Sequence, residues 1–307
     1  MTAFGRLWRR APLWRTSLFI MVGGMGMAAF FPTPALKKHL PWLPGKAPGA
    51  SPAPTQSAQG DGGGTSSNSP DSVTAPDPAI IQQGGLHLAG RIIPLPVGEW
   101  HPILAARTGP HGEISQQVLA RTSLGVVSGV IVVEASQQPL PPQAVDDLER
   151  PCHDDRNYAS QIVEKQGLVE ECAYIGNAFI LPGSPNGGPF VSAAFDRMNT
   201  LGFPIPPLMI TLGWYHAAAQ GTQGVQIEAV ETLIAPIEPG SRQLLAPPPV
   251  WTKDGIKTNP AAAKFISDVK TWMPGWTDLL RRGFDGKLDA NAIPIAPTRD
   301  PSAPKTP

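Results

Sequence analysis

Acidic residues are missing from the first 60 positions of this 307-residue chain, although seven basic residues occur there. Residues 61–307 therefore hold all 24 acids and 17 of the 24 basic residues, which gives them a net charge of −7. A surface with an excess of negative charge does not attract nucleic acid at long range. The charge distribution therefore argues against nucleic acid as a partner.

The sequence also lacks the common catalytic and binding signatures. It contains no GxSxG, HExxH or CxxC spacing and no phosphate loop that ends in GK[ST]. We therefore expect no metal site and no cofactor. Enzyme activity is disfavoured but stays an alternative. In that case we expect a membrane-anchored envelope hydrolase that uses a histidine base. The candidate bases are His101, His153 and His216.

Residues 16–36 form a mostly apolar run that contains no charged residue. A bilayer core needs about 20 mostly apolar helical residues, so this run predicts a single transmembrane helix. Four arginines precede it and two lysines follow it, which favours a cytoplasmic segment 1–15 and an inner-membrane location. The rest of the chain would then be periplasmic or extracellular. A basic segment before an apolar one also fits a cleaved signal peptide, which is the alternative.

Composition divides the remainder into three parts. Residues 37–79 are rich in Pro, Gly and Ser and hold few large apolar side chains, so they predict a disordered linker. Residues 80–288 carry the strand and helix patterns of one extracytoplasmic domain. The proline-rich residues 289–307 predict a disordered tail.

The patterns within this domain predict an α+β fold, with a mostly antiparallel sheet packed by two to three helices. The clearest element is a β-hairpin formed by residues 208–217 and 224–234. Pro102 marks an edge or a bulge in its strand, and a kink or break at Pro274 is expected in the last helix. The other predicted strands are 86–93, 99–107, 114–123 and 126–135, which form a meander, and 172–180; the predicted helices are 154–167, 189–201 and 260–284.

Only two cysteines are present, Cys152 and Cys172. They flank the predicted helix 154–167, and outside the cytoplasm they would meet oxidising conditions. We therefore predict a disulfide, which would stabilise the fold by roughly 3 kcal/mol on the loop-entropy model. Two unrelated reduced thiols are the alternative.

Four aromatic residues on or near predicted strands are candidates for a carbohydrate or peptide groove: Trp100, Trp214, Tyr215 and Trp251. Their positions suit ordinary core or edge packing equally well. With the predicted membrane span, the linker and the absence of a catalytic signature, they favour a membrane-tethered extracytoplasmic protein. We expect it to act as a binding or envelope-assembly module whose partners are the membrane, through residues 16–36, and an envelope protein.

Overall fold

The structure is a computed structural model. The predicted cytoplasmic segment, the predicted transmembrane helix and the predicted linker up to residue 71 lie outside the part of the chain that it describes. Within that part, no helix has the length and apolar character needed to cross a membrane. The described residues are 72–109, 111–141, 148–165, 168–181, 187–219, 224–238 and 240–304.

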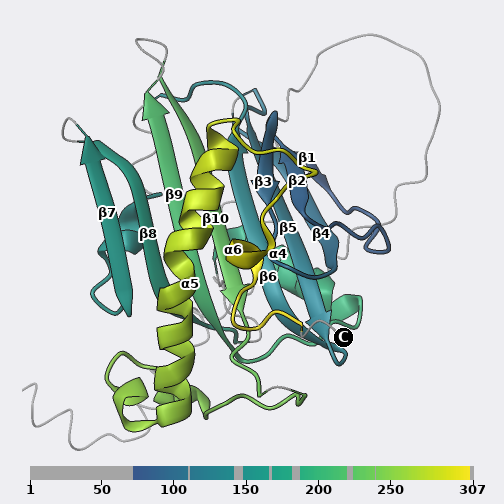
Figure 1. The fold of residues 1–307 in the computed structure, drawn as a ribbon. Coiled ribbons are helices and arrows are strands. Elements are labelled where there is room, and N and C mark those ends of the chain that lie inside the picture. Colours follow the sequence, from purple (N-terminus) through teal and green to yellow (C-terminus); the bar gives the residue numbers. More distant parts are fainter. Residues whose placement is uncertain are drawn as a thin grey trace, which may run out of the picture. The chain divides into compact units, whose positions relative to one another are not determined.

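An eight-stranded sheet forms the centre of the fold (Figure 1), and every neighbouring pair of strands in it is antiparallel. The α+β class with an antiparallel sheet is thereby confirmed. In spatial order the strands are β1 (Ser72–Thr74), β4 (Trp100–Thr108), β5 (Ile114–Ser123), β6 (Val126–Ser136), β10 (Val225–Ile234), β9 (Leu208–Ala219), β8 (Leu168–Phe179) and β7 (Ala159–Lys165).

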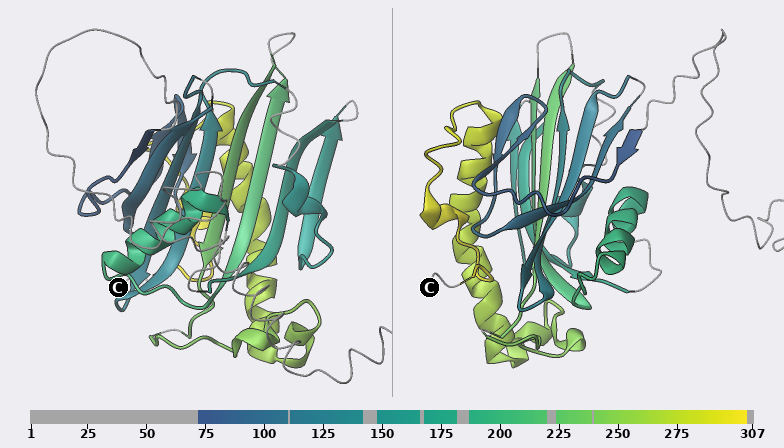
Figure 2. Two further views of the ribbon diagram at one scale, coloured as in Figure 1. Left: turned by 180° about the vertical axis from the view of Figure 1, so that it is seen from behind. Right: turned by 90° about the vertical axis from the view of Figure 1, so that its right-hand side faces the viewer.

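Helices cover the two faces of this sheet unequally. The long helix α5 (Pro260–Phe284) runs along one face, and α4 (Gly188–Thr200) lies on the other (Figure 2). A separate hairpin of β2 (Gly85–Leu88) and β3 (Arg91–Pro94) packs against α5. The short elements are η2 (Arg150–His153), η3 (Pro248–Val250), η4 (Gly255–Thr258) and α6 (Ile295–Thr298).

Helix α5 begins at a side-chain cap. The Asn259 carboxamide oxygen accepts hydrogen bonds from the backbone N–H groups of Ala261 and Ala262. Of the kink or break expected at Pro274, the break is wrong, because the helix continues through this residue to Phe284. Large side chains on both sides of this proline, Trp272 and Trp276 among them, belong to the core. Their burial offsets the roughly 3 kcal/mol that an interior proline costs a helix.

The predicted helix 154–167 is also wrong. Residues 159–165 form β7 instead, which pairs with β8 at the edge of the sheet. The β-branched Ile162 and Val163 suit a strand, and the edge of β8 offers backbone partners that a sequence window does not reveal.

Residues 86–93 likewise form two strands where one was expected. Ala89 and Gly90 both have positive φ angles, 51° and 76°, and make the two-residue turn between β2 and β3. The remaining meander strands are β4, β5 and β6, which neighbour one another as predicted. The irregularity expected from Pro102 appears as a register shift between Pro102 and Leu104.

The C-terminal segment is packed where its composition predicts disorder. Asp300 is 3% exposed, and its carboxylate receives two hydrogen bonds from the Arg121 guanidinium of β5, at 2.6 and 3.0 Å. The backbone carbonyl of Pro297 accepts a hydrogen bond from the Trp272 indole N–H. These long-range contacts hold the described residues of this segment against β5 and α5, and they pair polar groups that would otherwise be buried with fewer partners.

Replacing Asp300 by Asn tests this attachment. The change keeps the shape but removes one charge of a buried pair, which leaves Arg121 charged and uncompensated. We expect the free energy of unfolding, measured by urea denaturation of the purified chain, to fall by about 3–5 kcal/mol. The matched control is Asp254→Asn, which removes an exposed partner of Lys257 and should change stability little. Equal effects of the two variants would contradict the assignment.

Candidate functional site

A cavity of about 640 Å³ opens on the sheet face that carries α4. It lies between α4 and the segment 148–154, and a smaller cavity of about 190 Å³ adjoins it. We call the two together the groove. Its size falls in the range of small-molecule sites in proteins, about 300–1,000 Å³. The residues that border both cavities are Pro151, Tyr174, Gly187, Val191 and Glu231.

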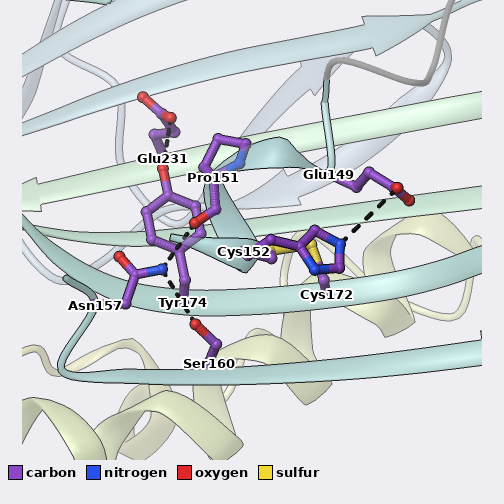
Figure 3. Close-up of a disulfide and its surroundings, with 9 residues drawn as sticks. Glu149, Pro151, Cys152, Asn157, Ser160, Cys172, Tyr174 and Glu231 are labelled. Atoms are coloured by element: carbon purple, nitrogen blue, oxygen red, sulfur yellow. Dashed lines mark hydrogen bonds and ion pairs between the residues drawn. A yellow bond between two sulfur atoms is a disulfide. The ribbon is translucent and has the colours of Figure 1, made fainter. Parts of the chain in front are cut away.

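A disulfide holds one wall of the groove in place. Cys152 of η2 is bonded to Cys172 of β8, with their Cα atoms 6.3 Å apart, which confirms the predicted bridge (Figure 3). Both sulfurs are buried with Tyr215 in a small apolar cluster. Pro151, the neighbour of Cys152, consequently stands at the edge of the groove.

Local hydrogen bonds shape the rest of this wall. The Asp154 carboxylate accepts hydrogen bonds from the backbone N–H and the guanidinium of Arg156. The Asn157 side-chain amide donates to the Pro151 carbonyl at 2.7 Å and to the Ser160 hydroxyl at 3.1 Å (Figure 3). These bonds fold residues 154–157 into a tight turn that leads into β7.

The pairing of three neighbouring strands brings the residues of the groove floor together. Tyr174 of β8 lies opposite Gly213 of β9, which lies opposite Glu231 of β10. The Tyr174 ring passes over this glycine. Its hydroxyl donates a hydrogen bond of 2.8 Å to Glu231 Oε1 (Figure 3). A Cβ atom at position 213 would overlap this ring, so the crossing requires glycine.

A second carboxylate lies on the adjoining strand. Glu134 of β6 is opposite Ala229 of β10, two residues from Glu231 and on the same face. The Gln116 amide of β5 donates a hydrogen bond of 2.9 Å to Glu134 Oε2. Glu134 and Glu231 are therefore diagonal neighbours on the floor of the groove.

Both carboxyls are desolvated. Burial raises the pKa of Glu134, against the hydrogen bond from Gln116. Burial also raises the pKa of Glu231, and the neighbouring charge of Glu134 raises it further. The pKa of the Tyr174 hydroxyl is raised as well, first by burial and then by Glu231. The floor therefore favours fewer negative charges than its two acids could carry.

The four aromatic residues proposed from the sequence do not gather in the groove. Trp100 and Trp251 are fully buried core residues, and their indole N–H groups donate to the carbonyls of Pro96 and Ala246. Trp214 is buried as well and stacks on His216. Trp214 and Tyr215 border the smaller cavity.

The three candidate histidine bases lie apart from one another. His101 contacts the Pro78 carbonyl and stacks on Phe203, and His153 is half exposed beside Glu149. His216 lies on the opposite face of the sheet, where its ring contacts Glu171 at 3.1 Å. In the described part of the chain, none of them is paired with a hydroxyl nucleophile.

His216 belongs to a buried row of charges beneath α5. Glu171, His216 and Glu228 lie opposite one another on β8, β9 and β10. Although burial acts to raise it, the pKa of Glu171 falls to about 2, because His216 and Arg281 donate hydrogen bonds to it. Burial raises the pKa of Glu228 to about 7, against the attraction of Arg91. Neither described cavity reaches this row.

The acids and the tyrosine on the floor were not among the residues predicted from the sequence. One signal was available, because Glu134 directly follows the mostly apolar run 126–133, and such a run favours a central strand with both faces covered. A glutamate in such a strand is expected to be desolvated, and thus unusual. Its meeting with Glu231 depends on which strands become neighbours, and this was outside the reach of local patterns. Among the described residues, no three side chains are placed to bind a metal ion.

Comparisons with protein-family models, with curated proteins and with solved structures find no match to this chain.

Removal of the disulfide tests its part in holding the groove wall. The bridged cysteines are 20 residues apart, so reduction should lower the free energy of unfolding by roughly 3 kcal/mol. Urea denaturation with and without reductant measures the difference. The control is the double variant Cys152→Ala, Cys172→Ala, whose midpoint should not respond to reductant. A wild-type midpoint that reductant leaves unchanged would contradict this role.

Proposed function

We propose that this chain is a single-pass, membrane-anchored extracytoplasmic binding protein whose folded part receives a ligand or envelope partner in the groove. The charge-free run 16–36, with basic residues before it, supports an inner-membrane anchor with a cytoplasmic N-terminus. The disulfide supports a folded part in an oxidising compartment outside the cytoplasm. A mature protein shortened by about 30 residues on a blot would instead support cleavage of a signal peptide.

One observation carries the binding role, namely a concave site with a polar floor on a rigid sheet. The polar side chains of the floor come from β5, β6, β8 and β10, and the backbone pairing of these strands fixes their positions. The disulfide-bonded segment and α4 form the two walls. Such an arrangement of a largely preformed pocket with a few convergent polar groups is typical of ligand sites.

Catalysis receives less support from the same site. The groove is bordered by carboxyl, amide and phenol groups, and none of the candidate histidine bases borders it. Nucleophilic hydrolysis needs a nucleophile within hydrogen-bond reach of a base. Among the described residues of the groove, the aliphatic hydroxyl groups belong to Thr211 and Thr252. The Thr252 hydroxyl accepts a hydrogen bond from the Gly255 backbone N–H and is not paired with a base. Binding is therefore the function that the geometry supports best.

Site-specific photocrosslinking in native membranes tests this function. Lys253 borders the larger cavity, and its ammonium donates to the Asp155 carbonyl. We expect the full chain with Lys253→p-benzoylphenylalanine to form a discrete adduct upon illumination, because the new side chain would contact the occupant of the groove. The measurement is a mass shift of the chain on a denaturing gel, followed by identification of the adduct.

Two variants provide the controls. Lys257 is an exposed lysine of the neighbouring η4 that borders neither cavity, so the same substitution there should give no such adduct. Ala178→Phe fills part of the larger cavity and should abolish the adduct formed from position 253. Equal adducts from positions 253 and 257, or an adduct that survives the filling of the cavity, would contradict binding in the groove.

A further inference from the structure

The charged groups at the rim of the groove are already occupied with one another. Arg156 forms an ion pair of 2.6 Å with Asp154, and Asp254 forms one of 2.7 Å with Lys257. Lys253 donates a hydrogen bond to a backbone carbonyl. Each of these rim charges thus already has a partner within the protein.

The floor is different, because its two acids have only neutral partners. Glu231 accepts a hydrogen bond from the Tyr174 hydroxyl, and Glu134 accepts one from the Gln116 amide. In the part of the chain that the structure describes, neither forms a salt bridge. These bonds engage one oxygen of each carboxyl group, and both residues border the smaller cavity.

The contrast with the opposite face of the sheet is informative. There, the buried Glu171 receives two hydrogen bonds from the Arg281 guanidinium and one contact from His216. A buried carboxylate is strongly stabilised by such a cationic partner and is costly without one. On the floor of the groove, the described residues provide two carboxylates but no cation. The missing charge is therefore expected to come from the occupant.

We propose that the groove binds a ligand through a primary ammonium group, which is placed between the carboxyl groups of Glu134 and Glu231. An ammonium carries three hydrogen-bond donors on a compact point charge, so it can serve two carboxylates on neighbouring strands at once. Aromatic residues beside the acids add to the attraction for a cation, because Tyr174, Tyr215 and Phe190 also border the smaller cavity. The larger cavity has room for the group that carries the ammonium.

A divalent metal ion fits this floor less well. Calcium takes six to eight oxygen ligands, and magnesium requires near-octahedral coordination. The described residues contain no group of three metal-ligating side chains. Two carboxylates with neutral neighbours match the needs of one ammonium more closely than those of a metal ion.

The inference rests on the proposed binding function and adds the class of ligand. It predicts a definite pH dependence. The ammonium pairs with ionised carboxylates, and their ionised fraction grows as the pH increases from about 4.5 through their raised pKa values. A primary amine stays protonated up to about pH 10. Affinity should therefore increase with pH over this window, and binding below the raised pKa values should release protons.

Isothermal titration calorimetry of the full chain in detergent tests the proposal. The probes are cadaverine, as a free amine, and Nα-acetyl-lysine methylamide, as a lysine side chain; the Nε-acetylated form of the latter is the uncharged control. We expect at least one charged probe to bind and the uncharged one to fail. The probe that binds distinguishes a small amine from a lysine side chain of a partner. Failure of both charged probes would overturn the proposal.

Variants of the floor separate a specific site from general attraction. Glu134→Gln and Glu231→Gln keep an oxygen that accepts the hydrogen bonds from Gln116 and Tyr174, so both should fold. Each should weaken amine binding about tenfold or more, since a charge-assisted hydrogen bond is lost, and the double variant should lose the pH dependence. Glu238→Gln, at an exposed acid outside the groove, should bind as the wild type does. Unchanged binding in the double variant would also overturn the proposal.

The two proposals can fail separately. If the amines do not bind while the photocrosslink from position 253 persists, the groove has an occupant of a different chemical class, and only the ammonium assignment is wrong. If that crosslink is absent as well, the binding function fails together with it.

Discussion

The antiparallel register of β8, β9 and β10 is the constraint on which both faces of this protein depend. Because side chains alternate across a strand, one pairing pattern places Tyr174, Gly213 and Glu231 toward α4, and Glu171, His216 and Glu228 toward α5. A slip of one residue in any of these strands would send each side chain to the wrong face. Gly213 adds to this constraint, since only glycine lets the tyrosine ring cross β9.

Buried carboxylates have different partners on the two faces of the sheet. Under α5 the carboxylate of Glu171 is matched by Arg281 and His216, and the surface is closed by the long apolar side of the helix. On the other face, α4 covers only part of the sheet, and a disulfide-bonded segment covers another part. The space left between them is the groove, and the two acids on its floor are matched only by neutral donors. Closed packing and an open site therefore occur on the two sides of the same strands.

Features set by local chemistry could be predicted from the sequence. The hairpin of β9 and β10, the irregularity at Pro102 and the disulfide follow from turn residues, from a missing N–H and from compartment chemistry. The predicted helix 154–167 is wrong because residues 159–165 pair with β8. The predicted disorder of the tail is wrong for the described residues 289–304, because Asp300 pairs with Arg121 on β5. Both errors come from contacts between residues far apart in sequence. The groove was missed for the same reason, because the polar side chains of its floor come from four strands.

A comparison with glutamine shows why the charge on the floor matters. Glutamine at positions 134 and 231 would accept the same hydrogen bonds from Gln116 and Tyr174, with nearly the same volume and without the cost of desolvating a carboxylate. The two side chains differ there mainly in whether they can become negative. In the described structure no neighbouring cation makes use of that property, so glutamate brings a cost to folding and no evident gain. A cationic occupant reverses this balance, because the attraction that is missing from the free protein is formed when it binds. The acids on the floor are therefore better explained by the bound state than by the fold.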